Sequence, residues 1–86
     1  MNEIYVRYVL NVQSPSSPRG NLWSYPAKVQ ALPGVGDQVE LWANGPARVV
    51  RARRWLIGVD EIQIELGNHP GDGRETRLRS EGWQPL

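Results

Sequence analysis

Hydrophobic and polar residues alternate over the first segment of this chain, residues 2–13. Every second position there carries an apolar or aromatic side chain: Ile4, Val6, Tyr8, Leu10 and Val12. A period of two places these side chains on one face of a β-strand, and β-branched and aromatic residue types favour strands. A helix built from the same residues would show no continuous apolar stripe. We therefore expect a strand with one buried face.

The middle of the chain, residues 32–66, has the pattern of a β-meander. Its predicted strands cover residues 38–42, 47–57 and 61–66, and a short strand over residues 27–32 precedes them. The last strand alternates most cleanly, with three apolar side chains predicted to point inward: Ile62, Ile64 and Leu66. The glycines in residues 33–37 permit a tight corner. Asn44 and Gly45 are a strong signal for a two-residue hairpin turn.

Residues 47–57 form the one irregular strand of this meander. Apolar residues occur at both odd and even positions and are interleaved with four arginines, so neither face is cleanly apolar. We therefore expect a β-bulge or a sharp twist near residues 51–54. The pairing with residues 61–66 that matches the two strands' faces puts Arg53 opposite Glu65.

The sequence predicts a single small β domain over residues 1–86. Two segments rich in Pro, Ser, Gly and Asn, residues 14–26 and 67–73, are expected to be surface loops. The fold class is mainly β, bordering on α+β: a five-stranded, bent antiparallel sheet or partial barrel with a short C-terminal helix.

Residues 74–82 fit either that helix or a further strand, and the helix is favoured. Asp72 and Glu75 have the spacing of a capping box. A glycine in the left-handed conformation often ends a helix, and Gly82 is placed to do so, with Trp83 folding back on Leu78.

Composition limits the kinds of function that this chain can carry. The formal net charge of +1 is small for a dedicated nucleic-acid binder, and nine of the ten basic residues are arginines. The absence of cysteine excludes disulfides and thiolate metal sites. Tryptophan is abundant, with four copies and no Phe. These rings either fill the core or form an interface, and the sequence leaves both possibilities open.

The candidate interaction residues lie on and beside the irregular strand: Trp42, Arg51, Arg53, Arg54 and Trp55. Rings and guanidiniums together can stack and pair with unpaired bases. However, residues 47–57 carry a charge of +4 while residues 60–66 carry −3, and pairing the two strands would neutralise much of the basic charge. Tryptophan and arginine are also enriched at the centres of protein interfaces. We therefore expect a homo-oligomer or another protein as the partner, with single-stranded nucleic acid as the alternative.

Catalytic chemistry has little support in the sequence. His69 is the only histidine and lies in a turn-like segment, the carboxylates show no metal-ligand spacing, and no nucleophile elbow surrounds the serines. Residues 33–37 lack the strand–loop–helix context of a phosphate loop. The protein is therefore expected not to be an enzyme and to use no metal or cofactor. It shows no membrane-spanning segment and no signal peptide, so we expect it in the cytoplasm, without a membrane partner.

The run LPGVGDQVELW…VVRARRW…DEIQIEL resembles a pattern in short, uncharacterised bacterial and mobile-element proteins, including orphan proteins of integron gene cassettes. In those proteins a Pro-x-x-Gly-Asp corner, here Pro33, Gly36 and Asp37, leads into a three-stranded meander. The resemblance covers about 40% of the chain by count of the quoted span, residues 32–66. It implies a small bent sheet or partial barrel and no particular activity. The C-terminal tail lies outside the pattern.

Overall fold

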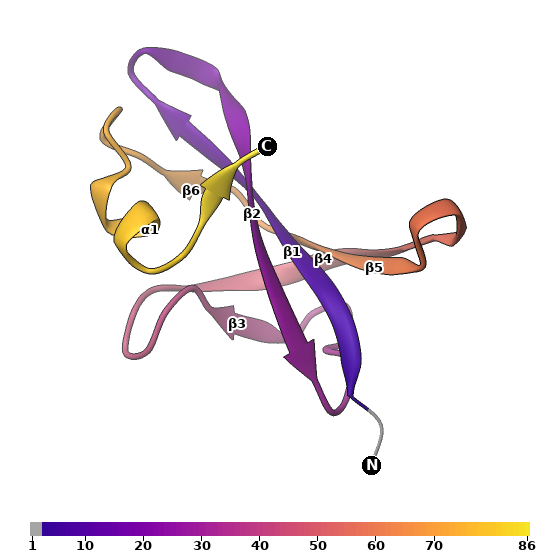
Figure 1. The fold of residues 1–86 in the computed structure, drawn as a ribbon. Coiled ribbons are helices and arrows are strands. Elements are labelled where there is room, and N and C mark those ends of the chain that lie inside the picture. Colours follow the sequence, from indigo (N-terminus) through magenta and orange to yellow (C-terminus); the bar gives the residue numbers. More distant parts are fainter. Residues whose placement is uncertain (1–2) are drawn as a thin grey trace.

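The computed structural model describes residues 3–86 and confirms a mainly β protein with a bent, unclosed sheet and one short helix (Figure 1). Its elements follow in this order: β1 (Ile4–Ser14), β2 (Ser17–Val29), β3 (Gln38–Glu40), β4 (Ala47–Leu56), a 3-10 turn (Ile57–Val59), β5 (Glu61–Leu66), β6 (His69–Pro70), α1 (Thr76–Ser80) and β7 (Gln84–Pro85). The described residues thus form seven strands rather than the five predicted. Position 2 of the predicted first strand lies outside the described residues.

The segment predicted as the first surface loop, residues 14–26, is instead mostly strand. β2 pairs antiparallel with β1 along nearly its whole length, and only Pro15 and Ser16 separate the two strands. Prolines are tolerated in an edge strand, where a missing N–H faces solvent. β7 pairs only with Trp23 and Ser24, so the remainder of β2, including Pro26, is such an edge. The second predicted loop, residues 67–73, likewise contains β6, which pairs with β1.

The strand order is β3-β4-β5-β1-β2-β7, with β6 beside β1. The long hairpins are antiparallel, as predicted, whereas β1 pairs with β5 in parallel from Val6–Ile62 to Val9–Glu65. Figure 1 shows that the β1–β2 hairpin crosses the β4–β5 pair at a steep angle. The parallel pair is thus the seam at which the sheet bends. It joins residues more than fifty positions apart in the chain.

The predicted irregularity of β4 is a bulge between Val50 and Ala52. Because the bulge absorbs one residue, the register beyond it differs by one from the predicted register. Arg53 lies opposite Ile64, and Glu65 lies opposite Ala52. The predicted Arg53–Glu65 pairing is therefore wrong, and Arg53 faces the same side of the sheet as the core residue Ile64.

The core lies on one face of the sheet, here called the inner face. Its buried residues come from four strands and the segments that cover them: Val6, Leu10, Val12, Trp23, Leu41, Val50, Ile62, Ile64, Leu66, Leu78 and Trp83. The opposite, outer face is mostly polar and accessible to solvent. Val9 and Ser24 on this face are nevertheless buried. The period of two in β1 and β5 therefore separates core from solvent as predicted.

The predicted C-terminal helix and its termination are confirmed. The N–H of Gly82, at φ 99°, donates to Arg79 O over 3.1 Å, and that of Trp83 donates to Leu78 O over 3.0 Å. This pair of bonds is a Schellman motif, and its usual apolar contact joins Trp83 to Leu78 in the core. The Trp83 indole Nε1 donates to Leu41 O over 2.9 Å, which ties the helix end to the chain after β3.

The predicted capping box takes a different form. Asp72 Oδ1 accepts from the N–H groups of Arg74 and Glu75 over 2.7 and 2.9 Å, while Glu75 Oε1 accepts from Gly73 N over 3.0 Å. These bonds stabilise the turn before α1. Glu75 itself adopts a left-handed conformation as the residue that precedes the helix. The hydrogen bond of Asp72 with Glu75 N and then that with Arg74 N lower the pKa of the Asp72 carboxyl.

Candidate functional site

The sheet register distributes the five predicted interaction residues over three environments. Trp55 and Arg53 lie opposite Ile62 and Ile64 and therefore point to the inner side of the sheet. Arg51 and Arg54 line a groove on the outer face. Trp42 packs against the core cluster. The structure thus does not bring the five residues together on one surface.

Trp42 is held as part of the fold. The guanidinium of Arg77 lies over its ring, 5.0 Å from the ring centroid. Gly45 packs so closely against the indole that a β-carbon at that position would overlap it. Arg79 similarly covers the ring of the buried Trp23, at 5.0 Å. Two arginines of the C-terminal helix thus cover two of the four tryptophans, which leaves Trp42 poorly placed for a partner.

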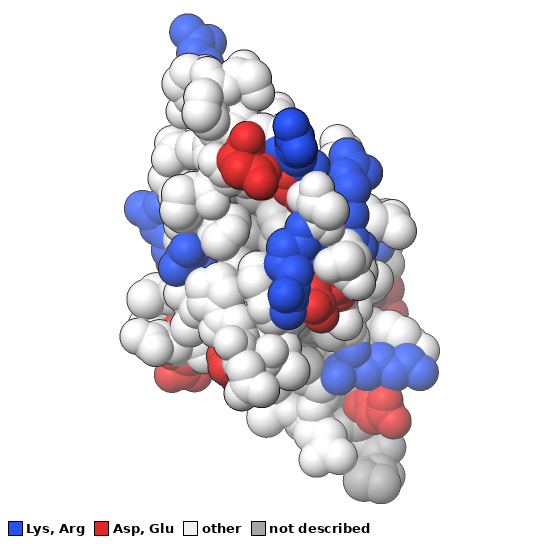
Figure 2. All heavy atoms as spheres, turned by 90° about the vertical axis from the view of Figure 1, so that its left-hand side faces the viewer, with Lys and Arg blue, Asp and Glu red and all other residues white. Residues whose placement is uncertain are grey.

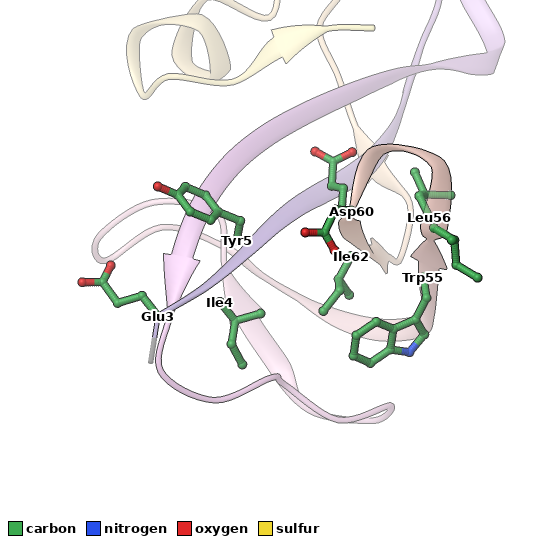
Figure 3. A pocket seen from close by; sticks show the side chains of 9 residues that line it. Glu3, Ile4, Tyr5, Trp55, Leu56, Asp60 and Ile62 are labelled. Atoms are coloured by element: carbon green, nitrogen blue, oxygen red, sulfur yellow. The ribbon is translucent and has the colours of Figure 1, made fainter. Parts of the chain in front are cut away.

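The inner face is covered at one end and open at the other. Leu78 and Trp83 pack on the covered end, whereas the open end is a cleft of about 390 Å³ between the start of β1 and the β4–β5 hairpin (Figure 3). Ile4 and Ile62 lie at this cleft, and Trp55 approaches it from β4.

Three exposed side chains that line this cleft are here called the end patch: Tyr5, which points to the outer side of β1, Trp55 from the inner side of β4, and Ile57 from the hairpin turn. Their exposed fractions are 62%, 65% and 94%, and Val59 beside them is also exposed. Trp55 and Ile57 are exposed because the β4–β5 hairpin extends past the part of the core that α1 covers (Figure 1). The hairpin closes through the 3-10 turn, in which Asp60 adopts φ 51° and its N–H donates to Ile57 O over 3.3 Å.

The end patch was only partly predicted, since sequence reasoning singled out Trp55 but neither Tyr5 nor Ile57. A signal was present: Trp55, Leu56 and Ile57 form an apolar run directly before Gly58. Hairpin connections are normally polar, so an apolar run at such a position indicates a surface that contacts something else.

Charges of both signs flank the end patch. Glu3, Asp60 and Glu61 line the cleft, and Glu61 is paired with Arg7 Nε over 2.8 Å. Arg53 lies two residues from Trp55 on the same side of β4 and is exposed. The patch therefore has an acidic flank towards β1 and the hairpin turn, and a basic flank along β4.

The outer face carries a second depression, here called the outer groove, of about 700 Å³. Arginines line it from two sides: Arg19 from β2, and Arg51 and Arg54 from β4. Arg54 Nη2 is 2.9 Å from Glu65 Oε1, whereas neither Arg19 nor Arg51 forms an ion pair within residues 3–86. Sequence reasoning missed Arg19, because only the long β1–β2 hairpin places it opposite β4.

On the side of the molecule that α1 occupies, charges of opposite sign are mixed. Figure 2, which views the side that α1 occupies, shows basic and acidic side chains next to one another without a large field of either sign. On α1 itself, Arg77 Nε is 3.0 Å from Glu81 Oε2.

The only histidine of the chain is engaged within the fold. Arg48 Nη2 donates to His69 Nδ1 over 2.8 Å, which requires that nitrogen to be unprotonated. Burial, and secondarily the Arg48 charge, lower the pKa of His69, and Glu75 partly opposes them. Among residues 3–86, no group of three or more metal-ligating side chains is close enough to hold a metal ion. Burial also raises the pKa of the Tyr8 hydroxyl.

No helix within residues 3–86 is both long and apolar enough to cross a membrane. Scans against protein-family models, curated proteins and solved structures found no match to this chain. The resemblance to short bacterial and integron-cassette proteins therefore stays a prediction from residues 32–66.

Proposed function

We propose that this protein is a non-catalytic interaction module that associates with a second copy of itself through the end patch. The observation that carries the proposal is the exposure of Tyr5, Trp55 and Ile57 around one cleft that apolar and acidic side chains line together. Clustered exposed apolar residues with a polar border are typical of protein-interaction sites. Aromatic residues supply much of the binding energy at such centres.

The two charged flanks support a second copy as the partner. In a two-fold symmetric pair, the same surface of both chains meets, so a surface with two flanks of opposite charge can be complementary to itself. A two-fold axis that passes near Trp55 and runs perpendicular to the line between the two flanks would bring Arg53 of one copy towards Glu3 and Asp60 of the other. Such complementary charges favour one orientation over others.

A stable interface needs more surface than the end patch alone provides. A typical interface buries about 800 Å² per partner, roughly a seventh of the 5818 Å² accessible surface of this chain. Three side chains cannot supply that area alone, so the interface includes the charged flanks as well as the end patch.

The non-catalytic part of the proposal rests on the side chains available for chemistry. His69 already accepts a hydrogen bond from Arg48, and its lowered pKa disfavours the protonated form. We place the module in the cytoplasm, because a β fold without cysteine does not depend on an oxidising compartment.

Light scattering coupled to size-exclusion chromatography tests the self-association. We expect a mass near twice the 9.7 kDa of the chain at micromolar concentration and above. Ile57→Asp places a charge in the centre of the interface and should return the mass to that of one chain. Val35→Asp is the matched control, because Val35 is exposed to 65%, does not line the cleft, and the charge change is the same.

Two results would overturn the proposal. One is a wild-type protein that remains a single chain over the whole concentration range. The other is equal association by the Ile57→Asp and Val35→Asp variants.

Single-stranded nucleic-acid binding, the alternative raised by the sequence, has less support. That hypothesis needs rings and guanidiniums on one surface, and Trp55 shares its side of the sheet with Arg53 but not with Arg51 or Arg54. Retention of a short oligonucleotide at low salt, lost in the Arg53→Ala plus Arg54→Ala variant, would restore it.

A further inference from the structure

We propose that the outer groove binds an extended acidic peptide segment of a partner protein. This site lies on the opposite side of the sheet from Trp55 and does not depend on self-association. Arg19 and Arg51 are the residues that would bind the segment's carboxylates from the two sides of the groove.

The two walls of the groove are built by different parts of the chain. Arg51 occupies the bulge of β4, between Val50 and Ala52, and points to the outer side with Arg54. Arg19 lies near the tip of the β1–β2 hairpin. Asn11 supports that tip, since its Nδ2 donates to Arg19 O over 3.5 Å and Gly20 leaves room for its carboxamide. Local backbone features of both walls thus aim guanidiniums at one space.

The charge of the groove favours an anion. Three guanidiniums line it against one side-chain carboxylate, Glu65, which Arg54 already neutralises. Arg19 and Arg51 have no ion-pair partner in residues 3–86, so an incoming carboxylate displaces no existing salt bridge. A guanidinium and a carboxylate form paired, charge-assisted hydrogen bonds, which give geometric specificity as well as attraction.

The other lining residues favour a peptide over a nucleic acid. The groove contains no aromatic ring among its described residues, whereas single-strand binding sites stack bases on aromatic side chains. Its floor instead has the apolar side chain of Val9 and the carboxamides of Asn11 and Gln63, which can pair with peptide groups. Glu65 would repel the regular phosphates of a nucleic acid, while a peptide can place a neutral residue beside it.

Fluorescence polarisation with a labelled oligo-glutamate peptide tests the site. We expect binding to the full chain at low salt that weakens as salt is added, because exposed ion pairs are screened. Arg51→Glu should weaken binding about ten-fold or more, since it removes one attraction and adds one repulsion. Arg19→Glu should have a comparable effect from the other wall.

Arg53→Glu is the matched control for Arg51→Glu. Both residues are exposed arginines of β4, and both substitutions change the net charge equally, but Arg53 points to the inner side. The control should retain oligo-glutamate binding to within about three-fold, a residual effect of the changed net charge. Circular dichroism confirms that each variant is folded.

Three outcomes would overturn the proposal. The first is no binding of oligo-glutamate by the wild-type chain at low salt. The second is equal weakening by Arg51→Glu and Arg53→Glu, which would indicate attraction by net charge alone. The third is tighter binding of an oligothymidylate of matched length, which would assign the groove to nucleic acid. Ile57→Asp, which tests self-association, should likewise retain oligo-glutamate binding to within about three-fold, so the two proposals fail separately.

Discussion

The two ends of the inner face differ in what covers them. At the covered end, Trp83 is 2% exposed, donates its indole N–H to Leu41 O and packs with Leu78. At the open end, Trp55 is 65% exposed although it lies opposite the core residue Ile62. The same residue type on the same side of one sheet therefore stabilises the fold at one end and is available to a partner at the other. Cover by a neighbouring segment, and not the strand pattern, makes the difference.

Replacing each of the two tryptophans by alanine in turn should give the largest difference in unfolding free energy between the two ends. Trp83→Ala leaves a cavity and an unpaired Leu41 carbonyl and should cost about 3–5 kcal/mol of unfolding free energy. Small domains have only about 5 kcal/mol in total, so this variant should retain no more than about 2 kcal/mol of stability. Trp55→Ala should change the stability of the single chain by no more than about 0.5 kcal/mol. Urea titrations followed by circular dichroism measure both, at concentrations where the chain is not associated. Similar losses in the two variants would show that the open end is also part of the core.

A glycine at each end sharpens the comparison at the level of the backbone. Gly82→Ala should cost about 1–2 kcal/mol, because φ 99° is strained for alanine and the added β-carbon would lie 2.9 Å from a Tyr25 ring carbon. Gly58→Ala, in the turn of the open end, meets no atom within 4 Å and should be close to neutral. The difference between their urea midpoints is the measurement. A neutral Gly82→Ala would mean that the Schellman motif contributes little.

A cation lies over an aromatic ring both at α1 and on the outer side of the β1–β2 hairpin, and the two pairs should differ in strength. Arg77→Ala removes a guanidinium from the half-buried Trp42 ring and should cost about 1 kcal/mol, which includes a small loss from its pair with Glu81. Lys28→Ala removes an ammonium 4.9 Å from the exposed Tyr5 ring and should cost about 0.5 kcal/mol or less. Thermal unfolding of the two variants, with the exposed Arg74→Ala as a reference, ranks them. A larger loss of stability in Lys28→Ala than in Arg77→Ala would contradict the view that burial of the ring strengthens such a pair.

The last prediction concerns pH and the region where β6 joins β1. The pKa of His69 is lowered in the folded state by burial and by Arg48, whereas an unfolded histidine titrates near 6.5. The unfolded chain therefore binds more protons in this range, and linkage requires stability to fall as the pH falls from about 7.5 through 6.5. Above about pH 7.5 the histidine is neutral in both the folded and the unfolded chain, so its protonation no longer lowers the stability. The urea midpoint of the His69→Gln variant should change less with pH over the same interval. A wild-type midpoint that rises on acidification would contradict the lowered pKa.

Most of the secondary structure could be predicted because its signals are local. The period of two in β1 and β5, the bulge in β4 and the Gly82–Trp83 helix end each depend on neighbouring residues. β2 was missed because its prolines and serines are typical of loops. Its inward residues Trp23 and Tyr25 are nonetheless held against β1, since an unpaired β1 would expose both backbone and core.

The candidate site was predictable only in part, for a related reason. The residues of β4 were recognised by type, but their division between the inner and outer sides depends on one bulge and one register. Arg19, more than thirty residues before Arg51, enters the same groove only through the pairing of β1 with both β2 and β5. Such contacts leave no trace in a local pattern.

The sequence by itself determined that the protein is mainly β, which side of each regular strand is apolar, and how the chain turns at Gly82. Only the tertiary structure decided which tryptophans are buried and which arginines share a surface. The physical reason is that alternation and turn chemistry act over a few residues, whereas cover and register arise from pairing between distant segments. The parallel β1–β5 seam and the cover by α1 leave one end of the inner face open, and this makes Trp55 the exposed member of the four.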